Sequence, residues 1–233
     1  MAKFHHRWTL PALVAALALA LLALAAGYVH YRQRTTLPQG ADLSKIGVEL
    51  TQDQDFVDLQ ALQSRGIDFV YLKSTQGRTY FDENYDFYKS QLRGSGMPFG
   101  TIMLVSNQSA PKAQVAYFLK KTGANWGALP ILLEPAPGAG NAETAMRKVA
   151  MLLVQHGRKL VVLTDSTAGY PQGVMFMAAG RRLPRRQRYA FWRYTTAGRV
   201  RGVNQLQQGV TMFAYLGSSS AFANSFKQAG GVQ

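Results

Sequence analysis

The sequence contains no cysteine, which excludes a disulfide scaffold, a thiolate metal site and lipid attachment through an N-terminal cysteine. Acidic residues are scarce as well, with 12 Asp and Glu against 26 Lys and Arg, so the formal net charge is +14. Beyond Glu134 the sequence holds only two more acidic residues, Glu143 and Asp165. The four histidines show no metal-ligand spacing, so we expect neither a metal nor another cofactor.

Charge is also absent from Thr9 to Val29, a run of mostly leucine and alanine that is long enough to span a bilayer. The run exceeds a usual signal-peptide core, and Tyr28 and Tyr31 suit an interfacial belt. Both features favour an uncleaved anchor over cleavage after Ala25, which stays open as the alternative. The expected segments are a cytoplasmic N-terminus (1–8), a transmembrane anchor (9–29), a linker (30–43) and one globular domain (44–233).

Strand-like and helix-like patterns alternate through the globular domain. Apolar runs that predict strands cover 46–50, 67–72, 99–105, 129–135, 160–163, 174–177, 189–194 and 210–215. Helical spacing covers 56–65, 84–92, 111–121 and 142–155. This alternation is typical of βαβ units and predicts an α/β fold with a parallel sheet closed into a barrel.

The stretch Leu129–Ala136 ends an apolar strand in a single carboxylate, Glu134, followed by Pro135. In a parallel α/β barrel, the chemistry sits at the carboxyl ends of the strands. Glu134 therefore stands where a catalytic acid is expected. The alternative is a strand-end glutamate that is solvated or paired with one of the many arginines.

Several motifs, in this order and spacing, resemble glycoside hydrolase family 25, the Chalaropsis-type lysozymes or muramidases. They are Ile46–Thr51, Gly66–Gly77, Ala113–Leu119, Phe191–Tyr194 and Gly198–Val203. The resemblance covers about residues 44–228. It implies an irregular TIM-like (βα)5β3 barrel, with five βα units and extra strands, that cleaves the β-1,4 link between N-acetylmuramic acid and N-acetylglucosamine.

Most acidic residues of the family's site are replaced at the matching positions of this sequence. The family's opening aspartate is Glu49 here, and its glutamate after Ala-Thr is Gln76. Without gaps, Glu134 takes the place of the aspartate on the fourth strand, and Ala136 takes the place of the catalytic glutamate. The late aspartate becomes Thr211. The resemblance thus implies that a site of four or five acidic groups is reduced to two.

The candidate catalytic residues are Glu134 and Glu49. The candidate substrate-binding residues are Gln76, Lys73, Trp192, Tyr194 and Thr211. Side chains alternate along the strand, so either Trp192 or its neighbours point toward the core. Trp192 is therefore equally well interpreted as a core residue or as a platform on which a sugar stacks. Lys73 has a second interpretation, as a salt-bridge partner of Glu49.

Three functions remain open. The first is a membrane-anchored lysozyme-like domain that acts on or binds peptidoglycan glycan strands, with hydrolysis weak or lost. The second is an active muramidase that uses Glu134 and Glu49. The third is a non-enzymatic module that binds a protein partner in an envelope complex. All three place the domain on the periplasmic side of a bacterial inner membrane.

A basic loop spans Arg181 to Arg188. Its charge suits anionic phospholipid, nucleic acid or an acidic wall polymer, and a solvated loop without a partner is an equal alternative. A translocated domain rarely meets nucleic acid, so we expect no nucleic-acid partner.

Overall fold

The computed structural model describes residues 9–32, 34–38, 45–185 and 187–226. The chain divides into two compact units, Met1–Thr35 and Thr36–Gln233. The predicted cytoplasmic segment, residues 1–8, lies outside the described residues, as do residues 33 and 39–43 of the predicted linker and residue 44 of the predicted globular domain.

The first unit contains one helix, α1 (Thr9–Arg32). Its span Leu10–Val29 has 20 residues, is long and apolar enough to cross a membrane, and is not buried by the protein. A signal sequence has the same properties, so retention of α1 as an anchor stays a prediction.

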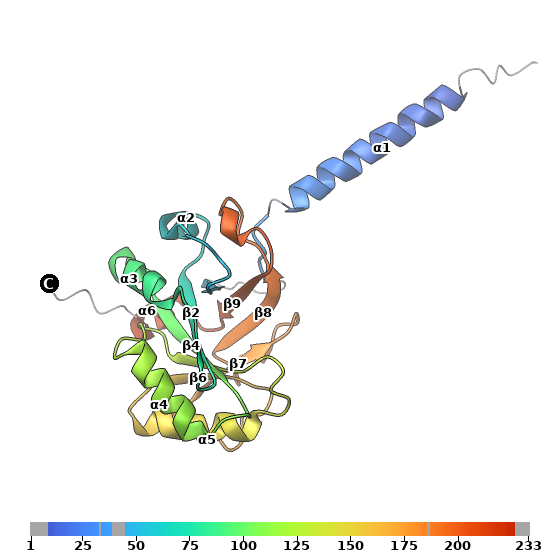
Figure 1. Cartoon of the computed structure of the whole chain (residues 1–233). Coiled ribbons are helices and arrows are strands. Elements are labelled where there is room, and N and C mark those ends of the chain that lie inside the picture. The colour runs from blue at the N-terminus through green and yellow to red at the C-terminus, as the bar shows by residue number, and fades with distance from the viewer. Residues whose placement is uncertain (1–8, 33, 39–44, 186, 227–233) are drawn as a thin grey trace, which may run out of the picture. The chain divides into compact units, whose positions relative to one another are not determined.

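The second unit consists of short strands and helices that alternate along most of its length (Figure 1). In chain order they are β1 (Ile46–Leu50), α2 (Leu59–Ser64), β2 (Phe69–Gln76), β3 (Tyr80–Phe81), α3 (Tyr85–Ser95), β4 (Phe99–Val105), α4 (Pro111–Thr122), β5 (Ile131–Pro135), α5 (Glu143–Gln155), β6 (Leu160–Leu163), β7 (Met175–Ala179), β8 (Phe191–Gly198), the 3-10 helix η1 (Asn204–Leu206), β9 (Val210–Tyr215) and α6 (Ser219–Ser225).

These strands form one sheet that closes on itself. The strand order is β1-β9-β8-β7-β6-β5-β4-β2-β3, and an additional parallel pairing of β1 with β2 completes the barrel. The pairs from β1–β2 through β7–β8 around the barrel are parallel, whereas β9 is antiparallel to both β8 and β1. The short β3 lies outside the ring as an antiparallel edge of β2.

The structure confirms the α/β fold class and the TIM-like barrel, with two differences in detail. In the described residues, the turns 164–174 connect β6 to β7 where the (βα)5β3 pattern implies a fifth helix. The helix expected from residue 56 begins at Leu59, because the Asp58 carboxylate caps it by accepting hydrogen bonds from the backbone N–H groups of Gln60 and Ala61.

Aromatic rings fill the N-terminal half of the barrel interior. The ring centroids of Phe69 and Phe191 lie 6.0 Å apart, and those of Tyr71 and Phe213 lie 5.5 Å apart. The rings fit because a glycine faces them: a Cβ atom at Gly47 would lie 2.1 Å from the Phe69 ring. This half of the barrel is therefore a packed core without room for a ligand.

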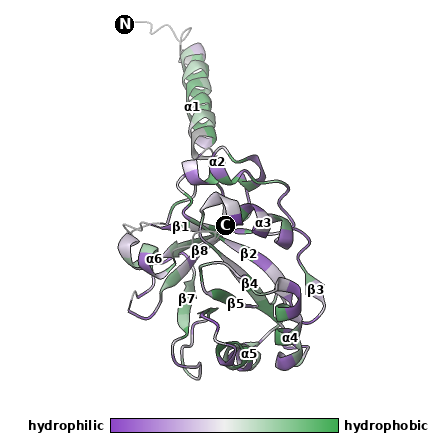
Figure 2. Cartoon of the chain, turned by 90° about the vertical axis from the view of Figure 1, so that its left-hand side faces the viewer, coloured by the Kyte–Doolittle hydropathy of each residue, from purple (hydrophilic) through white to green (hydrophobic). Residues whose placement is uncertain are grey.

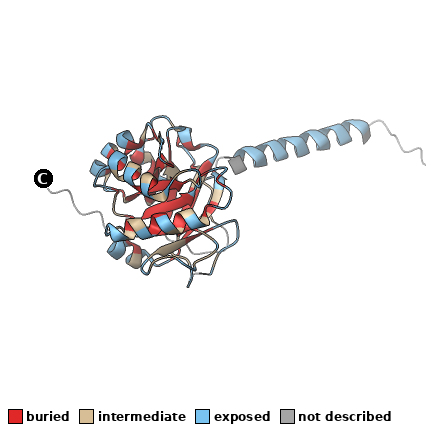
Figure 3. Ribbon diagram, turned by 60° about the horizontal axis from the view of Figure 1, so that its bottom comes forward, coloured by how far each residue is buried: buried red, intermediate tan, exposed pale blue. Residues whose placement is uncertain are grey.

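Helix α6 and the residue that follows it, Phe226, close the N-terminal end of the barrel with two more rings. Phe222 lies 5.5 Å from Phe69 between centroids, and Phe226 lies 5.8 Å from Phe191. Figure 2 shows that β4, β5 and β7 are largely hydrophobic, and Figure 3 shows buried strands beside helices with exposed outer sides. A functional site is therefore expected at the opposite end, where the parallel strands have their carboxyl ends.

Candidate functional site

Four charged side chains lie in the C-terminal half of the barrel interior, beyond the aromatic rings. They are Glu49 on β1, Lys73 on β2, Glu134 on β5 and Arg193 on β8. Glu49, Lys73 and Arg193 each follow, two residues later, a side chain or glycine that faces the packed interior. Because side chains alternate along a strand, these residues also face inward. The barrel thus brings two carboxylates and two cations together at its C-terminal mouth.

Glu134 is the most enclosed of these groups, with only 6% of the residue exposed. Its Oε2 accepts a hydrogen bond from Arg193 Nη1 at 2.9 Å, and its Oε1 is buried without a partner in the described part of the chain. The pKa of Glu134 is raised to about 7, mainly by burial and also by the charge of Glu49, against the opposing effects of Arg193 and Lys73. A carboxyl group with such a pKa holds or releases a proton near neutral pH.

Burial likewise raises the pKa of Glu49. A hydrogen bond from the Thr211 side chain and the charges of Lys73 and Arg193 oppose this rise. Both glutamates therefore feel the same two cations, while the charge of Glu49 raises the pKa of Glu134 and the charge of Asp82 raises that of Glu49. The structure brings Glu49, Glu134, Lys73 and Thr211 into one cluster.

The rim beside this cluster is acidic. Burial raises the pKa of Asp82, whose carboxylate accepts hydrogen bonds from the backbone N–H groups of Gln52 at 3.0 Å and Asn84 at 3.1 Å. Lys73 Nζ lies 5.4 Å from the centroid of the Tyr80 ring. Gln76 is half-buried at the end of β2, where it pairs with Tyr80 and with β4. Sequence reasoning passes over Asp82, which lies in the turn between β3 and α3.

Trp192 and Tyr194 do not belong to the cluster, which corrects their selection as sugar-binding residues. Trp192 is fully buried, and its Nε1 donates a hydrogen bond to the Gly180 carbonyl oxygen at 2.6 Å. Tyr194 is 5% exposed and donates to the Thr36 carbonyl oxygen at 2.9 Å. Both point away from the interior because Phe191 and Arg193, on the other face of β8, point into it.

Tyr194 instead fixes the chain that enters the barrel. The backbone N–H of Thr36 donates to the Arg199 carbonyl oxygen at 3.0 Å, and the N–H of Arg199 donates to Thr36 Oγ1 at 3.1 Å. Three hydrogen bonds thus hold residue 36 at the end of β8.

Ala136, the position of the family's catalytic glutamate, lies just beyond β5. Its backbone N–H donates to the Val105 carbonyl oxygen at 2.9 Å, and its methyl group is buried in the apolar core. The neighbouring positions Ile102, Met103 and Leu104 are also buried and apolar. No proton donor stands at residue 136.

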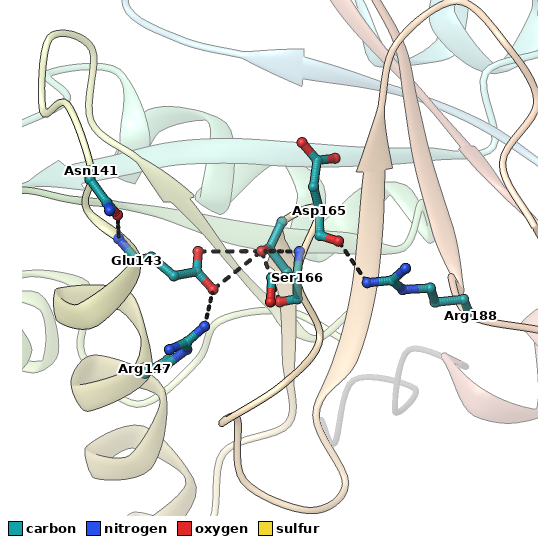
Figure 4. Close-up of polar contacts among 7 residues, drawn as sticks. Asn141, Glu143, Arg147, Asp165, Ser166 and Arg188 are labelled. Carbon is teal, nitrogen blue, oxygen red and sulfur yellow. Dashed lines mark hydrogen bonds and ion pairs between the residues drawn. The ribbon is translucent and has the colours of Figure 1, made fainter.

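A cavity of about 440 Å³ opens beside the charged cluster, at the carboxyl ends of β5 to β8. Arg193 forms part of its wall, and Pro135, Glu143, Thr164, Asp165 and Ser166 line it as well. Figure 4 shows Glu143 and Arg147 reaching from α5 toward the turn that follows β6. There Glu143 Oε1 lies 3.2 Å from Arg147 Nη2, and both its oxygens accept from Thr164 Oγ1 at 3.3 to 3.4 Å.

Sequence reasoning missed Arg193 and Glu143 as parts of this site. Alternation within 191–194 shows that Arg193 shares a face with Phe191, but not which face is the interior. Glu143 is the first residue of α5, where an acidic side chain interacts favourably with the helix dipole. The sequence therefore suggested a role in helix stability and not a place in the cavity wall.

The basic loop between β7 and β8 is exposed at Arg181, Arg182, Arg185 and Arg188. Arg188 is tied to the cavity rim, since its Nη2 donates to the Asp165 carbonyl oxygen at 2.6 Å. A partner for this loop stays a prediction. Within the described residues there is no group of three or more His, Cys, Asp or Glu side chains that could hold a metal ion.

Comparison with known proteins places the chain in a family. Residues 48–166 match the model of glycosyl hydrolases family 25. A segment of 54 residues is 32% identical to an autolytic lysozyme of Clostridium acetobutylicum. That segment spans 23% of this chain and only 17% of the lysozyme.

Solved structures of similar fold support this match. A family 25 glycosyl hydrolase from Bacillus anthracis has a TM-score of 0.67 and 18% identity, over 82% of this chain and 98% of that chain. A bacterial lysozyme from Streptomyces coelicolor has a TM-score of 0.61 and 21% identity, over 79% of this chain and 98% of that chain. At such identities the likeness establishes the fold, and the chemistry has to be argued from the residues of the site. Because the family model matches just over half of the 233 residues, and the barrel has the fold of these hydrolases, the chain belongs to glycosyl hydrolases family 25.

Proposed function

We propose that this domain binds the glycan strands of peptidoglycan on the periplasmic side of the inner membrane, held there by residues 9–29, and hydrolyses them weakly or not at all. The observation that carries the proposal lies at the carboxyl end of β5: residue 136 carries only a methyl group, and the Glu134 carboxylate is hydrogen-bonded to Arg193. Family membership supports the glycan, and the apolar helix α1 supports the membrane.

Loss of the acid has a chemical consequence. Glycoside hydrolysis needs a carboxylic acid that protonates the leaving oxygen and a second group that stabilises the developing sugar cation. Ala136 supplies no proton, and loss of general acid catalysis typically costs about 10²–10⁴ in rate. Glu134 is not an easy replacement, because it is buried and its Oε2 is taken by Arg193 at 2.9 Å.

Binding does not need the acid. The C-terminal mouth keeps a cavity of about 440 Å³, within the range of typical ligand sites. Its wall combines apolar carbon, such as Pro135 and Leu163, with the polar groups of Asn141, Thr164 and Ser166. This mixture of surfaces suits the hydroxyl and amide groups of amino sugars.

One observation favours the second candidate, an active muramidase that uses Glu134 and Glu49. A pKa of about 7 for Glu134 is what a general acid requires at neutral pH, and a neighbouring carboxylate is what the second role requires. This reading needs Arg193 to release Glu134 when glycan binds.

Two assays on the full-length protein in detergent separate these functions. The first is sedimentation with insoluble peptidoglycan, and the second is a zymogram that shows clearing of the same material. Retention without clearing supports the proposal. Clearing by the wild type that disappears in Glu134→Gln, but not in the control variant Glu83→Gln at an exposed position, overturns it in favour of the muramidase. No retention, with a co-purifying envelope protein, points to a partner-binding module instead.

A further inference from the structure

The segment that enters the barrel and the basic loop are held side by side on the outer face of β8. The Tyr194 hydroxyl donates to the Thr36 carbonyl oxygen at 2.9 Å, and Trp192 Nε1 donates to the Gly180 carbonyl oxygen at 2.6 Å. The two rings share one face of the strand, and their centroids lie 5.7 Å apart. One aromatic pair therefore holds both residue 36 and the residue that precedes the basic loop.

The chain between α1 and this point is short. Helix α1 ends at Arg32, and only residues 33–35 separate it from Thr36. A chain extends by at most about 3.6 Å per residue, so its length limits the distance from Arg32 to Thr36 to about 14 Å. If α1 spans the membrane, the outer face of β8 is therefore held close to the lipid headgroups.

The basic loop is fixed at both ends and exposed between them. The N–H of Gly180 donates to the Arg193 carbonyl oxygen at 3.1 Å, and beyond the loop the N–H of Ala190 donates to the Phe176 carbonyl oxygen at 2.9 Å. The arginines exposed between these two points are Arg181, Arg182, Arg185 and Arg188. The loop thus presents its cations to the solvent from a base that belongs to β7 and β8.

The chain itself supplies little negative charge to this loop. Residues 181–188 include five arginines and no acidic residue, and beyond Glu134 the sequence has only Glu143 and Asp165. Glu143 is paired with Arg147 at 3.2 Å, and within the described ranges no salt bridge joins an arginine of the loop to a carboxylate. The negative charge that balances the loop therefore comes from solution or from a partner.

Leu183 indicates the chemistry of that partner. Its side chain is 38% exposed and stands in the loop between two pairs of arginines, and Leu37, the neighbour of Thr36, is 64% exposed. Apolar side chains among cations suit the surface of an anionic bilayer, where the cations meet lipid phosphates and the apolar groups enter the acyl boundary. A nucleic acid or an acidic polymer would use the arginines and leave the leucines in water.

We propose that the basic loop is a second membrane contact, in which Arg181, Arg182 and Arg185 bind the phosphates of anionic phospholipids and Leu183 enters the interface beside them. An anchor alone leaves the barrel free to turn, whereas two contacts fix which side faces the membrane. This inference rests on the membrane placement in the proposed function and adds an orientation of the barrel that depends on the lipid.

The experiment uses the full-length protein in lipid nanodiscs, where α1 anchors it at either lipid composition. Because the sequence has no cysteine, one introduced cysteine gives one fluorophore position. Gln187→Cys places the fluorophore in the loop and leaves the arginines and Leu183 intact, while Ser90→Cys places it at an exposed position of α3. Quenching by lipids with a nitroxide on the headgroup reports proximity to the membrane. We expect strong quenching at residue 187 with phosphatidylglycerol, weak quenching there with phosphatidylcholine alone, and weak quenching at residue 90 with both.

Charge variants test the cause of the quenching. When Arg182→Gln and Arg185→Gln are combined, the ratio of membrane-bound to free loop in the anionic discs should fall by about tenfold or more, since each arginine adds to the attraction. The matched control combines Lys112→Gln with Lys120→Gln at exposed positions of α4, loses the same charge and should keep the ratio.

Four outcomes overturn the inference. Equal quenching at residue 187 in the two lipids excludes a preference for anionic lipid, and quenching that survives the loss of Arg182 and Arg185 excludes the arginines as its cause. Sedimentation with peptidoglycan that depends on the same two arginines assigns the loop to an acidic wall polymer instead. In these three cases the proposed anchor and glycan binding stand. Release of the protein from discs of both compositions overturns the proposed anchor, and the inference with it, while sedimentation with peptidoglycan still tests glycan binding.

Discussion

Arg193 and Glu134 are 59 residues apart in sequence and meet at 2.9 Å inside the mouth of the barrel. The pair is nearly buried, and a buried ion pair stabilises a fold less than its geometry suggests, because both charges lose their hydration. Removing one partner is costly, since the other remains as an uncompensated charge. The pair is therefore better explained by a role in the functional site than by its contribution to the stability of the fold.

The pH dependence of stability should report on Glu134. Its pKa is raised from 4.5 to about 7, so the folded protein binds this proton more tightly than the unfolded chain. The free energy of unfolding is then highest below pH 4.5 and falls as the pH rises to about 7, by about 3 kcal/mol from this group. In Glu134→Gln much of this fall should disappear, and the remainder reflects Glu49, whose pKa is raised in the same direction.

Urea unfolding between pH 5 and 8 measures this effect. Glu83→Gln serves as the matched control, since Glu83 is exposed and the substitution removes the same charge. An unchanged pH slope in Glu134→Gln would contradict the assignment.

Lys89 should contribute to the contact between α3 and α4. Its Nζ donates to the Thr122 carbonyl oxygen at 2.5 Å and lies 5.2 Å from the Tyr85 ring centroid. Thr122 ends α4, so its carbonyl has no partner within the helix. Lys89→Met keeps the apolar stem but leaves this buried carbonyl without a donor, and should lower the free energy of unfolding by about 1–3 kcal/mol. Urea unfolding measures this loss. Lys112→Met, at an exposed position of α4, is the control and should change the free energy of unfolding little.

Tyr194→Phe should loosen the chain that enters the barrel. The hydroxyl is bonded to Thr36, so its loss removes one of the three hydrogen bonds that hold that segment, worth about 1 kcal/mol. Amide exchange at residues 35–37 should become faster, while exchange in β1 should stay slow. Tyr117→Phe is the control, because it loses an equivalent bond to the Thr79 carbonyl oxygen elsewhere on the barrel. Equal exchange rates in the two variants would show that the Tyr194 bond does not hold the segment.

Trp192→Phe should separate folding from glycan recognition. The indole is fully buried and donates to Gly180, so its removal should cost about 1–3 kcal/mol of stability. Because Trp192 lies away from the cavity, the folded variant should sediment with peptidoglycan as the wild type does. A selective loss of sedimentation at unchanged stability would restore the sugar-platform role that the structure removes.

The sequence predicted the strands well because each parallel strand carries a strong local signal, an apolar run between breakers. It also placed Glu134 at a strand end, whereas Glu49 became a candidate through the family resemblance. It did not predict the pairing of Glu134 with Arg193, because alternation defines two faces of β8 without saying which is inside. That choice is made by Phe191, which joins the aromatic core through Phe69 and Tyr71.

Helix α6 illustrates a second limit. It has seven residues and a serine-rich start, so its periodicity is too short to predict a helix. Its position depends on Phe222 and Phe226 finding rings that belong to β2 and β8. Such long-range contacts leave no pattern in the local sequence.

The pairing of β1 with β9 also constrains when the domain can fold. Val48 of β1 lies opposite Met212 of β9, so the ring can close only when the first and the last of the described strands pair. A nascent chain emerging from a ribosome or a translocation channel cannot complete this barrel until synthesis has passed residue 215. Contacts so distant along the chain also slow folding. The native barrel can therefore form only after nearly the whole domain has been synthesised, and until then its apolar strands lack their partners.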